Sequence, residues 1–408
     1  MNYYNVTARI LTILVKTLFL FFLAKNFNPE AIGQYSLFQL SIFYLIIVSS
    51  GELQWFTARM YKSEPDKDLV ISTHIFLVSS YIVFFAFPLF YIAIVLNYLP
   101  SNLILLTFLL LVVEIFLQQI HYYLIIAHKS TYANIILFFR QGFWALLILL
   151  YYYVLGNRDV DLIDEIIKFW LIVDLLTTVV ILYKFNIELR LIFKKINLKK
   201  INFLFIKKAI LSSVLMFLLI IIVLSIDSGW KILIENYVSI SMLGVFSIYL
   251  SIAQATESLI TGGIIQTIYP KLNHAYFNDK NLYDKYMKIL LKKILIYSSI
   301  LLILSIPTSI ILFGYLGKPI YVDNLYLLYF ILLSVYFKLI EQVYNYDLII
   351  SGNEVKILMS NLLSVLLLMP FIYIFNSLEL MNLIIYSYLL FSFYRLIIKI
   401  IFSRSSDA

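Results

Sequence analysis

The chain has 408 residues, of which 62% are hydrophobic and 13% are charged, and its formal net charge is +8. Soluble globular domains carry about 25% charged and 45–50% apolar residues, so this composition excludes a soluble protein and indicates an integral membrane protein. The chain has no cysteine, which excludes disulfides, thiol chemistry and cysteine-based metal sites.

Twelve apolar segments follow one another along the chain, each near the length of about 20 residues that a membrane helix needs. A β-barrel would instead show alternating segments of about 10 residues. The first run, from Val6 to Ala24, has no small-residue cleavage site after it and is predicted to be a retained span. We therefore predict an all-α polytopic membrane protein with spans near residues 6–26, 36–58, 72–97, 102–126, 132–155, 163–185, 208–230, 237–262, 291–315, 323–350, 356–375 and 379–402.

Lys and Arg are distributed unevenly between the two sides of the predicted spans. Of the 31 basic residues, 23 lie on the side of the two termini, and the opposite side has Lys25, Arg158, Lys231 and Lys318. This bias predicts that both termini are cytoplasmic, because basic loops stay on the cytoplasmic side. The basic run 190–208 is interpreted as a topology signal that contacts anionic lipid, and no nucleic-acid binding is expected.

The loops between the predicted spans are too short to hold a folded domain. The longest extracytoplasmic loop covers about 156–161, and the longest cytoplasmic loops lie near 186–207 and 271–290. The function is therefore expected inside the helical bundle. We predict an N-terminal six-helix lobe at 1–186, a basic cytoplasmic linker at 187–207 and a C-terminal six-helix lobe at 208–408.

The two halves of the chain share features in the same order. With a shift of 211, Gly33 falls on Gly244, Ser36 on Ser247 and Gly51 on Gly262, and with a shift of 223 the segment 119–126 falls on 342–349. Matches in order, with six spans in each half, favour two repeats. Because six is even, the halves would have the same orientation and be related by an axis along the membrane normal, with a substrate path between them.

Three segments resemble Wzx-type polysaccharide flippases. The first, near the start of the chain, is Asn28-Pro29-Glu30-Ala31-Ile32-Gly33-Gln34-Tyr35-Ser36-Leu37. The other two, at the start of the second half, are Ser225-Ile226-Asp227 and Met242-Leu243-Gly244-Val245-Phe246-Ser247. These flippases belong to the multidrug/oligosaccharidyl-lipid/polysaccharide (MOP) exporter superfamily. The resemblance implies two six-helix lobes around a cavity that opens alternately to either side of a bacterial inner membrane. It implies a cargo of undecaprenyl-diphosphate-linked oligosaccharide, an O-antigen or capsule repeat unit, moved from the cytoplasmic to the periplasmic leaflet. Polymerase and chain-length proteins of the same pathway are the implied partners.

Basic residues inside the spans are the candidates for binding such a cargo. A charge at the bilayer centre costs about 2.5–3.5 kcal/mol on insertion scales, so it usually faces a cavity or a partner. Lys16, at the centre of the first span, either binds the diphosphate or pairs with an acid on a neighbouring span. Arg140 either holds phosphate in a bidentate fork or pairs with Asp174 on the next span. Lys338 is the third candidate, although it shares a helix face with Glu341 and the two are expected to pair.

Acids inside the spans are the candidates for coupling and gating. Asp227 and Glu257 flank the entrance of the second half, Glu52 and Glu114 lie on the second and fourth spans, and Asp174 lies on the sixth. Such acids carry a coupling proton or sodium ion in secondary transporters, and no other cofactor is expected. Glu52 lies close to the cytoplasmic face and is alternatively only hydrated. The family resemblance implies that Asp227 fixes or gates the seventh span.

Two alternative functions remain at this stage. Another member of the same superfamily would carry lipid II, a teichuronic-type glycan or drugs, and a cavity for cationic drugs would hold mainly acids. A Wzy-type polymerase or polytopic glycosyltransferase would need a large extracytoplasmic loop, which the predicted spans do not leave. The chain also has no glycine-rich phosphate loop followed by Lys-Ser or Lys-Thr, so no ATP hydrolysis is expected. We therefore predict a transporter and not an enzyme.

Overall fold

The computed structural model describes residues 3–404 except 55, 58–59, 61–65, 127–128, 156–161, 185–200, 202 and 376. The described residues form helices, turns and short connections, with no strand among them. Among the described residues, eleven helical segments are long and apolar enough to cross a membrane, and each overlaps a predicted span. Helix α1 (Tyr3–Asn26) covers the remaining predicted span. The all-α polytopic fold is confirmed, and the side of the membrane on which the termini lie stays a prediction.

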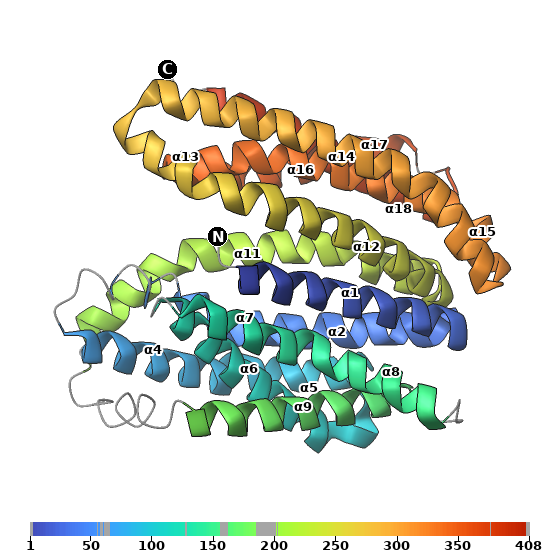
Figure 1. The fold of residues 1–408 in the computed structure, drawn as a ribbon, viewed down its shortest axis with the longest axis horizontal. Coiled ribbons are helices and arrows are strands. Elements are labelled where there is room, and N and C mark those ends of the chain that lie inside the picture. The colour runs from blue at the N-terminus through green and yellow to red at the C-terminus, as the bar shows by residue number, and fades with distance from the viewer. Residues whose placement is uncertain are drawn as a thin grey trace. The chain divides into compact units, whose positions relative to one another are not determined.

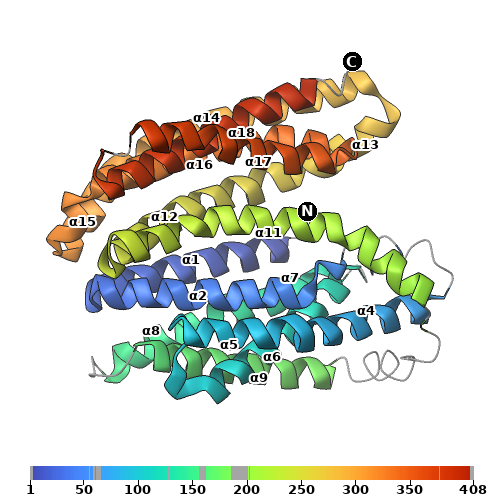
Figure 2. The same cartoon turned by 180° about the vertical axis from the view of Figure 1, so that it is seen from behind.

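The chain divides into two compact units, each a bundle of helices (Figures 1 and 2). The first unit combines Met1–Phe19 with Gln34–Ile221, and the second combines Leu20–Gly33 with Ile222–Ala408. The lobe boundaries expected at 186 and 208 stay predictions, and most of the linker lies outside the described residues. Up to residue 237 the helices are α1, α2 (Pro29–Ser50), α4 (Lys67–Tyr81), η1 (Ile82–Ala86), α5 (Phe87–Val95), η2 (Ser101–Leu103), α6 (Ile104–Ile126), α7 (Ser130–Phe138), η3 (Phe139–Phe143), α8 (Trp144–Leu155), α9 (Leu162–Lys184) and α11 (Phe203–Tyr237).

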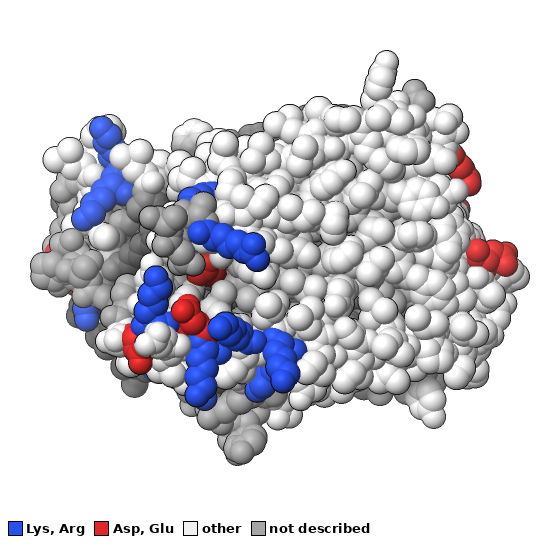
Figure 3. Space-filling model, turned by 90° about the horizontal axis from the view of Figure 1, so that it is seen from above, with Lys and Arg blue, Asp and Glu red and all other residues white. Residues whose placement is uncertain are grey.

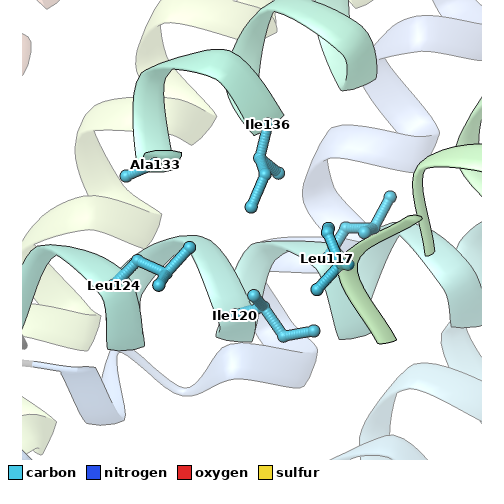
Figure 4. Close-up of a cluster of buried hydrophobic side chains, with 6 residues drawn as sticks. Leu117, Ile120, Leu124, Ala133 and Ile136 are labelled. Atoms are coloured by element: carbon cyan, nitrogen blue, oxygen red, sulfur yellow. The ribbon is translucent and has the colours of Figure 1, made fainter. Parts of the chain in front are cut away.

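In the first unit, α6 packs against both α7 and α9. The contact is made by a cluster of buried aliphatic side chains, which Figure 4 shows between α6 and α7. Further along, the indole rings of Trp144 and Trp170 stack with their centroids 5.1 Å apart. Dispersion between close-packed apolar groups holds such helices together where lipid removes most of the hydrophobic driving force. The aliphatic cluster consists of Leu117, Ile120, Leu124, Ala133, Ile136 and Ile181.

The predicted second span is interrupted near its end. Helix α2 ends at Ser50, and both Gly51 (φ +52°) and Glu52 (φ +54°) have left-handed backbone conformations. A β-carbon at Gly51 would lie 1.9 Å from the ring of Tyr81, so only glycine fits there. The expectation of one continuous span over 36–58 is therefore wrong at this turn. The apolar pattern of the sequence continues across the turn and does not indicate it.

The second unit is built around α16 (Leu325–Ile350), which packs against α12 (Ile240–Ile260), α14 (Lys280–Leu316) and α18 (Leu380–Arg404). Gly33 and Gly244, the two glycines that the shift of 211 aligns, lie at one crossing within this unit. A β-carbon on Gly33 would lie 2.2 Å from the Ile240 carbonyl oxygen, and one on Gly244 would lie 1.9 Å from that of Pro29. Any larger residue would push the two helices apart. The remaining elements are η5 (Thr261–Ile265), α13 (Gln266–Asn278), α15 (Pro319–Asp323) and α17 (Glu354–Ile374).

The exposed surface of the helices is apolar over long stretches. Ile303 and Ile311 of α14 are both well exposed, as are Tyr91 of α5 and Val180 of α9. On the face that Figure 3 shows, Lys and Arg gather toward one end, and a broad band without charged side chains lies beside them. A band of this kind suits the hydrocarbon core of a bilayer, with the charged end in the headgroup region.

Candidate functional site

Among the residues that the structure describes, charged side chains gather at two places, one inside each compact unit. We call them the N-terminal cluster, carried by α1, α6, η3 and α9, and the C-terminal cluster, carried by α11, α12, α16 and α18. The N-terminal cluster consists of Lys16, Glu114, Gln118, Arg140, Gln141, Trp170 and Asp174. The C-terminal cluster consists of Asp227, Glu257, Lys338, Glu341, Arg395 and Lys399.

The buried ion pair between Arg140 and Glu114 is the centre of the N-terminal cluster. The Arg140 Nε donates to Glu114 Oε2, and Nη2 donates to Gln118 Oε1 at 2.7 Å. The other carboxylate oxygen of Glu114 accepts from the indole Nε1 of Trp170 at 2.8 Å. The expected pairing of Arg140 with Asp174 is therefore wrong, because Glu114 on α6 takes the guanidinium. A buried charge is tolerated when its lone pairs and protons are satisfied in this way.

Lys16 lies beside this ion pair with a weaker partner. Its side chain is half-buried, and its ammonium donates to the side-chain oxygen of Gln141 at 3.3 Å, while the nearby Glu114 carboxylate attracts it without forming a salt bridge among the described residues. The alternative in which Lys16 forms a structural ion pair is not what the described residues show. An ammonium group has three N–H donors, so a single hydrogen bond to an amide leaves donors available for an anion.

Asp174 is the least satisfied member of the N-terminal cluster. It lies one helical turn beyond Trp170 on α9 and has 0% of its surface exposed. Its carboxyl group lies beside Glu114 and Trp170, although neither of its oxygens has the geometry of a formed hydrogen bond to a described residue. An ionised carboxylate without donors in an apolar interior carries a large desolvation cost.

A local change of helix geometry brings two of these residues to the cluster. Arg140 and Gln141 lie in η3, a single π-helical turn inserted between α7 and α8. A π-turn rotates the side chains that follow it relative to an unbroken α-helix, and such turns often lie at functional sites. In η3 the π-turn allows two neighbouring residues to reach different partners, since Arg140 bonds to Glu114 and Gln141 bonds to Lys16.

The C-terminal cluster is centred on Glu341 of α16. Its Oε1 accepts from Arg395 Nη2 at 2.9 Å and also from Lys399, and both bases come from α18. The Lys399 ammonium also donates to Asn345 at 2.8 Å. The expected pair between Lys338 and Glu341 is wrong, because Glu341 forms its salt bridges with Arg395 and Lys399 of α18.

A more open group of charges continues the C-terminal cluster. The Lys338 ammonium lies 3.3 Å from Glu257 and 3.6 Å from Asp227, and Arg395 Nη1 lies 3.8 Å from the other oxygen of Asp227. The Asp227 side chain is 37% exposed, whereas Glu341 and Lys399 are buried. Acids and bases alternate along this chain of contacts, so each charge has an opposite neighbour.

Arg395 and Lys399 are the cluster members that the sequence pattern missed. They lie in the last turns of the final span, and the topology count places them with the cytoplasmic basic residues. The structure buries them beside Glu341 instead. Their spacing of four residues on one helix face was the available signal, since two bases on one face predict an acid opposite.

Glu52 lies outside both clusters. It is 3% exposed, and its carboxylate accepts a hydrogen bond from Gln54. The interpretation of Glu52 as a merely hydrated residue is therefore wrong. Its left-handed backbone at the end of α2 is uncommon for a residue with a side chain, so the surrounding structure must favour this turn.

No protein-family model matches the chain, and no curated protein sequence matches it. Solved structures do resemble it. An inward-facing multidrug resistance MATE family transporter of the MOP superfamily matches with a TM-score of 0.71 at 15% identity, covering 99% of this chain and 97% of that one. A MOP superfamily transporter from Pyrococcus furiosus Vc1, described as having a binding pocket of reverse polarity, matches with a TM-score of 0.59 at 15% identity, covering 99% and 94%. At this identity the likeness shows the fold, which is that of MOP superfamily transporters.

Proposed function

We propose that the chain is a flippase that moves an undecaprenyl-diphosphate-linked oligosaccharide, such as an O-antigen or capsule repeat unit, across a bacterial inner membrane. The transporter fold and the short loops support transport over catalysis. The Wzx-like segments around Gly33 and Gly244 support a lipid-linked glycan as cargo.

The observation that carries this proposal is the incomplete pairing of Lys16. Arg140 is satisfied by Glu114 and Gln118, and the C-terminal bases all contact acids. Within the described residues Lys16 donates a hydrogen bond to an amide and forms no salt bridge, and it lies near the middle of α1. A diphosphate crossing the membrane needs cations that are available inside the spans. Lys16 is the proposed diphosphate ligand, and Arg140, one residue before Gln141, is the proposed second one.

Asp174 is the proposed site of a coupling proton. Its carboxyl group is fully buried beside Glu114 and has no well-formed hydrogen bond to a described residue, which supports a proton and not a sodium ion at this position. When Glu114 and Arg140 rearrange around a bound diphosphate, the charge near Asp174 changes and the proton can be released. The more exposed Asp227, bridged by Lys338 and Arg395, is proposed to gate α11.

The test of the cargo is the Lys16→Ala variant in a cell that depends on this chain for its surface glycan. We expect surface glycan to fall below about a tenth of the wild-type level, because losing a charged hydrogen bond costs about 1.5–3 kcal/mol. The amount of protein in the membrane should not change. Lys168→Ala is the matched control, because Lys168 is an exposed lysine paired with Glu165 and lies outside both clusters. Normal surface glycan in the Lys16→Ala strain would exclude Lys16 as a phosphate ligand.

A drug exporter of the same superfamily is the second candidate. It is favoured by the multidrug transporters among the structural neighbours and by the partly exposed acid Asp227, which suits a cationic compound. This function predicts that deleting the gene lowers the minimal inhibitory concentration of cationic amphiphiles and leaves surface glycan unchanged. Asp227→Asn should then reproduce the deletion, and Lys16→Ala should not.

A further inference from the structure

An apolar groove runs along the outside of the first unit, between α7–η3 and α9. Its cavity has a volume of about 210 Å³. This is less than the roughly 300–1,000 Å³ of sites for drug-sized molecules, so it has room for a single extended chain. The walls are almost entirely hydrocarbon, and they include Ile135 and Phe143 on one side and Leu176 and Val180 on the other.

One end of the groove carries a positive charge. Lys184, the last residue of α9, lines the groove and is exposed. Its ammonium lies over the ring of Tyr132 near the start of α7, 4.5 Å from the ring centroid. The topology predicted from the basic residues places this end at the cytoplasmic face, where anionic headgroups attract lysine. A tyrosine with a lysine beside it is also typical of the membrane interface.

The depth of the groove matches one leaflet of a bilayer. Along α9 it extends from Lys184 to Val173. Eleven helical steps of about 1.5 Å each give about 16 Å, which is half of a hydrocarbon core about 30 Å thick. A lipid of the cytoplasmic leaflet would therefore place its headgroup at Lys184 and the end of its chain at the deep end.

The groove lies directly behind the N-terminal cluster. Val173 and Phe139 line its deep end, and the next residue in each case, Asp174 or Arg140, belongs to the cluster. Ile136 of the groove wall is also part of the buried aliphatic cluster that Figure 4 shows. A chain filling the groove would press on the helix turns that hold the charged residues.

We propose that this groove binds one anionic phospholipid of the cytoplasmic leaflet, with an acyl chain along α9 and the phosphate at Lys184. The basic side chain selects the headgroup, and the apolar walls accept the chain. The lipid holds η3 and α9 together behind Arg140 and Asp174. The inference concerns a resident lipid and does not depend on which cargo the transporter moves.

The test is native mass spectrometry of the purified full chain with phosphatidylglycerol or phosphatidylcholine carrying the same acyl chains. The wild type should retain one lipid and prefer phosphatidylglycerol about fivefold, as one lysine near the surface contributes about 1 kcal/mol. Lys184→Gln should abolish this preference. Lys168→Gln should retain it, because Lys168 lies near the opposite end of α9 and outside the groove.

A second pair of variants tests the groove itself. Leu176→Trp fills the groove and should reduce binding of both lipids by about tenfold or more. Leu175→Trp is the matched control, because Leu175 is the neighbouring exposed leucine of α9 and does not line the groove. Equal lipid binding by these two variants, or an undiminished preference for phosphatidylglycerol in Lys184→Gln, would overturn the proposal.

Discussion

The two charge clusters contain similar residues and differ in how completely they are paired. In the C-terminal cluster three acids and three bases alternate, and each has an opposite charge within 4 Å. In the N-terminal cluster one ion pair is complete, the Lys16 ammonium donates to an amide, and the Asp174 carboxyl group, beside Glu114 and Trp170, has no well-formed hydrogen bond among the described residues. Removing one member of a fully paired buried network leaves an uncompensated charge and is costly, whereas incomplete pairing leaves groups available for a ligand or a proton.

This difference leads us to expect different tasks for the two units. Charges that exist only to hold helices together should be paired, because every unpaired charge in a span is costly. Lys16 is costly in this sense, and neither Lys16 nor Asp174 takes part in the Arg140–Glu114 pair. We therefore expect substitutions in the C-terminal cluster to act mainly on stability, and substitutions of Lys16 and Asp174 to act mainly on transport.

Glu341→Gln should have the largest effect on stability. It leaves two buried bases, Arg395 and Lys399, without their shared acid. Removing one partner of a buried ion pair typically costs about 3–5 kcal/mol. Thermal unfolding in detergent should show a much lower midpoint and a smaller folded yield. Glu379→Gln, at an exposed acid of the same unit, should leave the midpoint unchanged, and an equal midpoint for both variants would contradict the difference between the clusters.

Methionine substitution of Lys338 and of Lys16 compares the clusters directly, because methionine keeps most of the length of lysine without its charge. Lys338→Met leaves Asp227 and Glu257 without their bridging base and should cost about 1–2 kcal/mol, since the pairs are partly exposed. Lys16→Met removes only the bond to Gln141 and should change stability by less than about 1 kcal/mol. A larger loss of stability for Lys16→Met would reverse the assignment of tasks.

The positions of the spans could be predicted because apolar runs of about 20 residues have few alternatives in a membrane protein. The turn at Gly51 and Glu52 could not, because the apolar pattern continues across it and the cause is a contact with Tyr81 on another helix. A positive φ angle at Glu52 does not change the hydropathy pattern of the sequence.

The members of the clusters could be predicted better than their pairing. A charge inside a span indicates a partner, which correctly drew attention to Arg140 and Lys338. Which acid each base meets depends on helix rotation and on the π-turn η3, and these follow from packing of whole helices. Arg395 and Lys399 were missed because a base near a span end has two possible environments, the headgroup region and the helix interior.

Asp174→Asn should have the smallest effect on stability and is the sharpest test of the N-terminal cluster. Asparagine has nearly the shape of a protonated aspartic acid, so a carboxyl that already holds a proton loses little when it is replaced. The midpoint of thermal unfolding should shift by an amount that corresponds to less than about 1 kcal/mol. Transport measured in vesicles should lose its dependence on the proton gradient, because asparagine cannot release a proton. A destabilisation near that of Glu341→Gln would instead show that Asp174 is an ionised partner of Arg140, and unchanged gradient dependence would exclude it as the coupling residue.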